Sequence, residues 1–281
     1  MERQAQQLNV DYPSCPHPDP PPALRGREYT TLQTLFMTSD TENNHIETEP
    51  PSRRSVRSFV IRRGRSTAAQ ERALEELWPQ FGIEFSEKPL DLDALFGRRA
   101  RTMVEIGFGA GEALLSFARE NPDMNCLGIE VHPPGVGHLL LGVQGAALTN
   151  VRVLMHDAVE ILERQIPPAS LCLAHIFFPD PWPKKRHHKR RLIQPEFVAL
   201  LARALAPGAT LRLATDWEHY AMHMRDVLDA SPQFDNRAGA LGFVERASAR
   251  PVTRFERRGQ RLGHSVWDLE YERREEVTGD G

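Results

Sequence analysis

The central part of the chain alternates between short apolar runs and amphipathic stretches. The apolar runs predict strands at 103–106, 125–130, 151–155, 171–178 and 211–214, with a last strand near 266–271. Between them, apolar residues recur at helical spacing and predict helices to about 119, at 136–147, at 159–164, from 195 to about 205, and at 218–228. Alternation with short connections is typical of an α/β fold with a mostly parallel, doubly wound sheet and helices on both faces.

Capping residues and the helix breakers proline and glycine predict where some helices begin and end. Thr67 and Gln70 form a capping-box pattern, so order is expected to begin there. Pro79 and Gly82 predict the end of that first helix, and Pro207-Gly208 predicts the end of the helix that starts at Pro195.

The N-terminal part has a different composition. Residues 1–52 are rich in proline and poor in clustered aliphatic residues, which predicts a disordered tail; Met37 offers an alternative start of translation. Residues 53–66 are rich in arginine and predict a basic arm. The arm could contact phosphates or be only a flexible basic linker, and the sequence favours neither role. Residues 67–281 are expected to form a single domain.

Charge and cysteine content narrow the class of protein. The 281 residues carry a formal net charge of −3, so a site for a polyanion must be local. Cys15, Cys126 and Cys172 are scattered without CxxC spacing, which disfavours zinc and disulfides and favours a reducing, cytoplasmic location. No apolar run is long enough to span a bilayer, and no signal peptide is evident.

A glycine-rich turn follows the first predicted strand. Its GxGxG spacing differs from the GxGxxG of dinucleotide sites, and no P-loop Lys-Ser/Thr follows. Acidic residues lie at the ends of successive strands, where ligands of such sheets bind. The glycines are Gly107, Gly109 and Gly111, and the acidic residues are Glu105, Glu130, Asp157 and Asp180.

Backbone access rimmed by carboxylates suits a cationic, hydroxyl-rich nucleoside, and S-adenosylmethionine has those properties. Glu130 is expected to accept the ribose hydroxyls, Asp157 the adenine amino group, and Glu105 to steer the loop or face the methionine ammonium. In the alternative, the glycines only make a tight turn and the carboxylates cap helices.

The segment 178–191 combines an Asp in a proline-rich aromatic turn with a dense basic run. Asp180 is followed by six Lys or Arg residues and two His, a pattern that favours chemistry on a polyanion over a solvated charge run. His219 and His223 lie four residues apart, but Tyr220 stands where a zinc protease needs Glu. We therefore expect no metal site.

These motifs together make the chain resemble the bacterial tRNA (guanine-N7-)-methyltransferases over about three quarters of its length, from Arg57 to Glu272. The segments that carry the resemblance are Arg57–Val60, Arg72–Pro79, Glu105–Gly109, Gly128–His132, Phe178–Arg191, Thr215–Glu218 and Thr253–Gly259. The resemblance implies a Rossmann-like class I S-adenosylmethionine-dependent methyltransferase that methylates N7 of a guanine in the tRNA variable loop, usually at position 46.

The resemblance also implies roles for individual residues. The cofactor carboxylates would be Glu105, Glu130, Asp157 and Asp180. The tRNA and substrate positions would be Lys184, Arg186, His187, His188, Lys189, Arg190, Arg191, Asp216, Thr253, Arg254, Phe255 and Glu256. Arg254 stands where Lys is common, which keeps the charge but changes the donor geometry.

Guanine N7 carries a free lone pair, so the reaction needs positioning rather than a general base. Asp180 is the candidate catalytic residue, because its carboxylate can hold the base and offset the positive charge that develops on it. Asp216 is a second candidate for guanine recognition, with an N-cap of the following helix as its alternative role. Another RNA methyltransferase, a non-catalytic RNA-binding module and a small-molecule methyltransferase are the competing functions, and the oligomeric state stays open.

Overall fold

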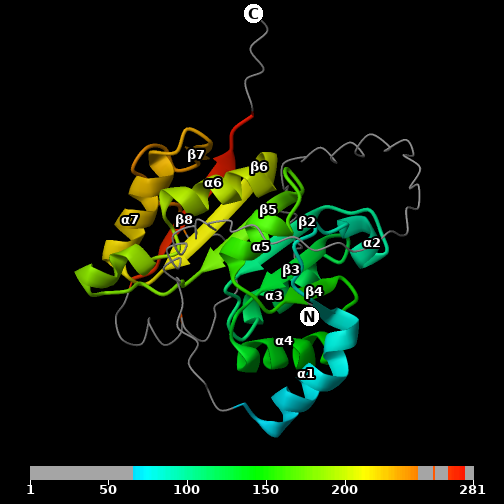
Figure 1. Ribbon diagram of the computed structural model, residues 1–281. Helices are drawn as coiled ribbons and strands as arrows, with labels where there is room; N and C mark the ends of the chain where they lie inside the picture. Colours follow the sequence, from blue (N-terminus) through cyan, green and yellow to red (C-terminus); the bar gives the residue numbers. More distant parts are fainter. Residues whose placement is uncertain (1–65, 246–255, 257–264, 276–281) are drawn as a thin grey trace, which may run out of the picture.

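The computed structural model describes residues 66–245, 256 and 265–275 (Figure 1). Within these residues the strands form one eight-stranded sheet in the order β1-β4-β3-β2-β5-β6-β8-β7. The first six strands in that order pair in parallel, and β8 pairs antiparallel with both of its neighbours, β6 and β7. The prediction of a mostly parallel sheet with helices on both faces is confirmed.

The strands are β1 (Gly82–Ile83), β2 (Thr102–Ile106), β3 (Asn125–Ile129), β4 (Val151–Leu154), β5 (Leu171–Phe177), β6 (Leu205–Thr215), β7 (Phe234–Asn236) and β8 (Trp267–Arg273). The helices are α1 (Ala68–Phe81), α2 (Leu92–Phe96), α3 (Glu112–Glu120), α4 (Pro133–Gly145), α5 (Ala158–Arg164), α6 (Pro195–Ala204) and α7 (Glu218–Asp229), with a 3₁₀ helix, η1, at Lys185–Arg190.

Two apolar cores lie on opposite faces of the sheet. Along β2, Met103 belongs to the core under α1, α3 and α4, and Val104 to the core under α5, α6 and α7. Side chains alternate between the two faces along a strand, so one continuous apolar run serves both cores. This explains why the central strands are recognisable in the sequence.

The capping box at α1 is confirmed. The Thr67 backbone N–H donates to Oε1 of Gln70 at 2.9 Å, and the Gln70 N–H donates to Oγ1 of Thr67 at 3.3 Å. Pro79, however, lies inside α1 rather than at its end. It falls in the last turn, where only the bond to the carbonyl four residues earlier is lost.

The predicted end of α6 at Pro207-Gly208 is wrong. The helix ends at Ala204, and both residues lie inside β6. There the register slips, since Leu171 of β5 pairs with Leu205 whereas Leu173 pairs with Thr210. The Pro-Gly pair thus makes an irregular bulge within a long strand instead of a turn. The short β1, α2 and β7 have no counterpart in the prediction.

Candidate active site

The glycine loop directly follows β2 and borders open space. Gly107 and Gly109 have φ of 71° and 56°, in the left-handed region that favours glycine. A Cβ atom added to either residue would meet no atom within 4 Å. The loop therefore offers bare backbone to a ligand at the carboxyl end of the central strands, where such sheets bind ligands.

Glu130 follows β3 and holds this loop in place. Its Oε2 accepts the Gly109 N–H at 2.8 Å, and its Oε1 accepts the N–H groups of Val131 at 2.7 Å and His132 at 3.0 Å. Burial raises the pKa of Glu130, although these three bonds act against the rise. The carboxylate is thus fixed in direction beside the glycine loop.

Glu105 lies in β2 directly before the loop and is a buried acid. Its side chain is 2% exposed, and its Oε2 has no hydrogen-bond partner among the described residues. Burial raises its pKa from 4.5 to about 8. A cationic group placed next to this carboxyl would favour its charged form. The residues present therefore fit a ligand with a positive charge, such as the sulfonium and ammonium of S-adenosylmethionine.

The loop's own helix also disfavours a phosphate ligand. The N-cap of α3 is Gly111, and Glu112 is an acidic residue in its first turn. Helix N-termini attract anions, and a carboxylate there repels a pyrophosphate. This agrees with the interpretation that the GxGxG loop binds a nucleoside without a pyrophosphate rather than a dinucleotide.

Asp157 follows β4 and is the N-cap of α5. Its Oδ1 accepts the Val159 N–H at 2.9 Å, so the capping role considered as the alternative is present. Contact with the adenine amino group stays a prediction.

A cavity of about 310 Å³ lies beside this strand end, lined in part by Trp78, Phe85 and His156. The rings of Phe85 and His156 stack with centroids 3.9 Å apart. None of the four predicted cofactor carboxylates lines this cavity. It is therefore separate from the glycine loop, and no pattern in the sequence predicted it.

Asp180 is exposed in a turn with unusual backbone geometry at both ends. Phe178 has φ of 51° and Trp182 has φ of 44°, values that are rare for bulky residues and cost free energy. The Phe178 N–H donates to the carbonyl of Ala214 at 2.8 Å, which ties the start of the turn to β6. Strained backbone of this kind is common at functional sites.

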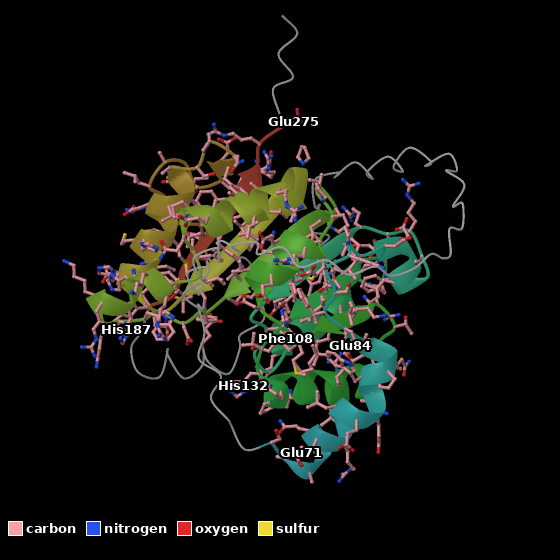
Figure 2. All side chains as sticks on the ribbon, in the orientation of Figure 1. Glu71, Glu84, Phe108, His132, His187 and Glu275 are labelled. Atoms are coloured by element: carbon pink, nitrogen blue, oxygen red, sulfur yellow. The ribbon has the colours of Figure 1, made fainter. Side chains whose placement is uncertain are left out.

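The basic run forms η1 and presents its cations to solvent. Lys184, Lys185, Arg186 and Lys189 are exposed, and the guanidinium carbon of Arg190 lies 5.0 Å from the centre of the Trp182 ring. Figure 2 shows His187 well away from Phe108. An exposed row of cations suits contact with phosphates.

The two histidines of the run are biased toward the neutral form. Desolvation, followed by the charges of neighbouring Arg and Lys side chains, lowers the pKa values of both His187 and His188. A phosphate next to them would act in the opposite direction, because it favours the charged imidazolium.

Arg191 differs from its neighbours and corrects the expectation that the whole run contacts tRNA. It is 2% exposed, and its Nε donates to the carbonyl of Pro181 at 3.0 Å. Its Nη2 donates to Nδ1 of His219 at 3.3 Å, and its guanidinium carbon lies 4.8 Å from the centre of the Tyr220 ring. Arg191 supports the aromatic turn from within, and a buried guanidinium is not available to phosphate.

The alternative role of Asp216 as a helix cap is wrong. The N-cap of α7 is Trp217, which makes no side-chain capping bond. Asp216 directly follows β6, which ends at Thr215, and is partly exposed. Guanine recognition by Asp216 stays a prediction.

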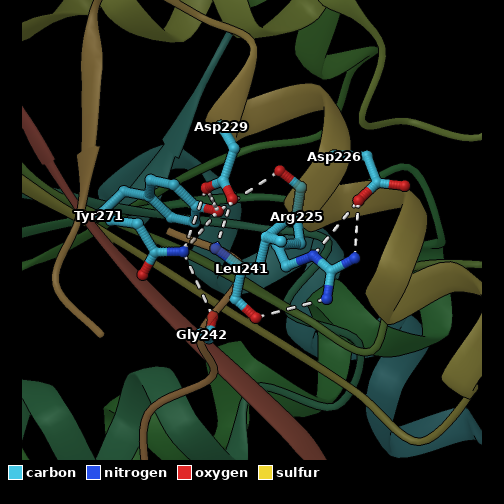
Figure 3. Close-up of polar contacts among 7 residues, drawn as sticks. Arg225, Asp226, Asp229, Leu241, Gly242 and Tyr271 are labelled. Atoms are coloured by element: carbon cyan, nitrogen blue, oxygen red, sulfur yellow. Dashed lines mark hydrogen bonds and ion pairs between the residues drawn. The ribbon is translucent and has the colours of Figure 1, made fainter. Parts of the chain in front are cut away.

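Thr253, Arg254 and Phe255 lie outside the described residues, while Glu256 is buried with 1% exposure. The chain before this segment is fixed by a polar network (Figure 3). Asp229 accepts the Tyr271 hydroxyl at 2.6 Å and the Leu241 N–H at 3.0 Å. Burial acts to raise the pKa of Asp229, but these bonds hold it below its ordinary value. The network ties α7, β8 and the loop before residue 245 together.

His223 is half-buried, with its Nε2 2.8 Å from the carbonyl oxygen of Ile193, whereas His219 is exposed. Over the part of the chain that the structure describes, no group of three or more His, Cys, Asp or Glu side chains is placed to hold a metal ion. Over the same part, no helix combines the length and apolar character needed to cross a membrane.

Comparison with known proteins identifies the class first. A family described as "Putative methyltransferase" matches residues 99–269, a range that runs from before β2 into β8. Among solved structures, the 16S rRNA methyltransferase KamB resembles the chain with a TM-score of 0.49 at 15% identity, covering 67% of this chain and 95% of KamB.

Curated relatives then give the family. The tRNA (guanine-N(7)-)-methyltransferase of Leifsonia xyli subsp. xyli is 56% identical over 79% of this chain and 98% of its own length. Those of Alkalilimnicola ehrlichii and Shewanella woodyi are 57% and 50% identical, covering 79% and 84% of this chain and 94% and 99% of their own lengths. The chain belongs to the tRNA (guanine-N(7)-)-methyltransferase family, as the sequence motifs predicted.

Proposed function

We propose that this protein transfers a methyl group to N7 of a guanine in the variable loop of tRNA, at position 46, to form 7-methylguanosine. S-adenosylmethionine is the methyl donor and supplies an electrophilic methyl group on a sulfonium. Within the protein, the observation that carries this proposal is Glu105, a buried acid whose Oε2 has no hydrogen-bond partner among the described residues, beside bare glycine backbone. Membership of the family supports the substrate.

On the cofactor side, Glu130 would direct a carboxylate at the ribose while it holds Gly109, and Asp157 would meet the adenine beyond the end of β4. Glu105 would place negative charge beneath the methionine end, and its ionised form becomes favoured when a cation is bound. These residues bind and orient, and none has to move a proton in the reaction.

On the substrate side, Asp180 would hold the edge of the guanine and offset the positive charge that develops on the ring. Guanine N7 attacks with its own lone pair, so no residue has to act as a base. Asp180 is exposed at the carboxyl end of β5, where an RNA base can reach it. We include Asp180 among the cofactor contacts and Asp216 as a second contact to the guanine.

The exposed Lys184, Lys185, Arg186 and Lys189 and the half-buried Arg190 would bind phosphates and set the orientation of the tRNA. His187 and His188 would act together with them. Thr253 to Glu256 would complete the substrate side. We place the reaction in the cytoplasm, where tRNA is available.

The decisive experiment is mass spectrometry of nucleosides from unmodified tRNA incubated with the full chain and S-adenosylmethionine. The proposal expects 7-methylguanosine, and tRNA with position 46 changed from G to A should lose the signal. Methylated adenosine in its place would show another RNA methyltransferase. Cofactor binding without any methylated nucleoside would leave tRNA methylation unsupported.

A further inference from the structure

The first turns of α4 pack directly against the glycine loop. A Cβ atom added to Gly135 would lie 2.2 Å from the carbonyl oxygen of Gly109 and 3.7 Å from Cγ of Glu130. The obstructing atom belongs to the backbone, so no side-chain rotation can relieve the clash. Any larger residue at position 135 must therefore displace either α4 or the glycine loop.

A second contact joins the same two segments. The ring nitrogen Nδ1 of His138 lies 2.8 Å from the carbonyl oxygen of Ala110, and the ring must donate in this bond. The Gly109 N–H already donates to Glu130 at 2.8 Å. The loop is thus held by Glu130 at its N–H and by α4 at its carbonyl side.

The α4 helix is a rigid support for these contacts. Pro133 and Pro134 occupy its first positions, and proline fixes φ there. Val136 and Leu139 are fully buried on the same turns. Gly137 packs against the backbone of Gln70 in α1, at 2.6 Å from an added Cβ to the carbonyl oxygen. A larger residue at position 135 is therefore expected to move the glycine loop rather than α4.

We propose that Gly135, supported by His138, is a positioning residue for S-adenosylmethionine that sets the place of the Gly109 carbonyl and hence the contact of Gly109 with Glu130. This proposal rests on the proposed function. The sequence pattern did not predict this role, because Gly135 lies in α4, 26 residues after Gly109 of the glycine loop.

The test is calorimetric titration of Gly135→Ala with S-adenosylmethionine. We expect Kd to rise about tenfold or more, as when one charge-assisted hydrogen bond is removed. Affinity for tRNA should stay within about twofold of wild type, and kcat at saturating cofactor should change less than KM for the cofactor. The matched control is Gly145→Ala at the other end of α4, where an added Cβ meets no atom within 4 Å.

Two further variants separate positioning from folding. Gly137→Ala is expected to lower Tm by disturbing the packing of α1 on α4 while leaving Kd within about threefold. His138→Ala removes the second contact without a clash and should raise Kd about threefold to tenfold, so it tests the proposal even where Gly135→Ala folds poorly.

Cofactor affinity within twofold of wild type in both Gly135→Ala and His138→Ala would overturn the inference. Equal losses of affinity in Gly135→Ala and Gly137→Ala would also overturn it, since general loosening would then explain both. Absence of cofactor binding by the wild-type protein would instead refute the proposed function.

Discussion

The cofactor side and the substrate side of this sheet edge are built in different ways. At the glycine loop, the N–H of Gly109 is bonded to the carboxylate of Glu130 and its carbonyl lies against Gly135 of α4, so contacts hold it from two directions. At the aromatic turn, Asp180 stands exposed between two residues with positive φ, followed by a 3₁₀ helix of solvent-facing cations. The glycine loop is therefore held in position before a small ligand binds. The aromatic turn and the basic run after it would be ordered largely by contact with a large polyanion.

The difference indicates how each region positions its ligand. A small cofactor offers few contacts, so the protein must supply a fixed site. A tRNA offers many phosphates, and each contact can contribute to its orientation. The turn at Asp180 keeps its own fixed elements, namely its bond to β6 and the buried Arg191 beneath Pro181.

The comparison is tested most severely by Asp180→Asn, which removes the charge with little change in size. We expect turnover to fall about 10²-fold or more, as for loss of one preorganised electrostatic contact, with tRNA and cofactor affinity retained. Single-turnover kinetics at saturating tRNA and cofactor measure this, with the exposed Asp123→Asn at the opposite edge of the sheet as control. A near wild-type rate would limit Asp180 to shaping the turn and move its role to Asp216.

On the cofactor side, Glu130→Ala and Asp157→Ala should weaken S-adenosylmethionine binding by about 1.5–3 kcal/mol each, the cost of a charge-assisted hydrogen bond. Glu130 also loses its hold on Gly109, and Asp157→Ala loses a helix cap worth about 1 kcal/mol of stability. Calorimetry should show these losses while tRNA affinity stays nearly unchanged. Unaltered cofactor affinity in both variants would remove these two residues from the site.

The raised pKa of the buried Glu105 predicts that the stability of the folded protein depends on pH. Because the pKa of Glu105 is about 8 in the folded protein and 4.5 when unperturbed, its favourable contribution to stability is complete below about pH 4.5 and is lost as the pH rises to about 8. Without cofactor, urea unfolding between pH 5 and 8 should show stability falling with pH, by up to about 1.4 kcal/mol per pH unit.

Glu105→Gln should flatten this profile, whereas the exposed Glu163→Gln should leave it as in wild type. A cationic cofactor should bind wild type more tightly as the pH rises through the same range, because the ionised carboxylate is its partner. Parallel profiles for wild type and Glu105→Gln would show that this acid does not titrate there.

The substrate side should respond to salt instead. Neutralising Arg186, Lys189 and Arg190 should reduce the salt slope of tRNA binding by roughly 0.7–0.9 for each phosphate that these side chains no longer neutralise. Arg191→Gln should leave the slope unchanged and lower Tm, because this guanidinium is buried and bonded to Pro181. An unchanged slope in the triple variant would show that the run is only a solvated surface.

The smallest effect is expected from removing residues 1–52, which lie outside the described residues. Their proline-rich composition cannot supply a packed core, so turnover should stay within about twofold. Removal through residue 65 should additionally weaken tRNA binding if the arginine-rich arm contacts phosphates. A large loss of turnover from the shorter truncation, measured by the rate of 7-methylguanosine formation, would show that the tail is part of the active enzyme.

The sequence predicts the central sheet well for a physical reason. Strands buried on both faces, such as β2 and β3, must be continuous apolar runs, and their glycine and acidic ends mark the ligand edge. The long β6 was cut short because Pro207-Gly208 has the local chemistry of a turn, and only its pairing with β5 makes it a bulge.

The burial of Arg191 could not be predicted from the pattern of charged residues. Arg191 is the last of a uniform basic run, and only the packing of α7 places Tyr220 and His219 against it. The close approach of Gly135 to the Gly109 carbonyl is likewise a property of two backbones brought together by the fold. Residue types and spacing thus indicate the chemistry of the site, while the supporting contacts depend on tertiary structure.

The attachment of α1 has a consequence for synthesis on the ribosome. This helix packs on α4 through Gly137, and β1 pairs with β4, so its partners appear about 70 residues later in the chain. At roughly 5–20 residues per second, α1 waits several seconds before it can dock. During that time its apolar face, with Leu77 and Phe81, has no partner and is available to chaperones. The capping box at the start of α1 would favour the helical conformation during that interval.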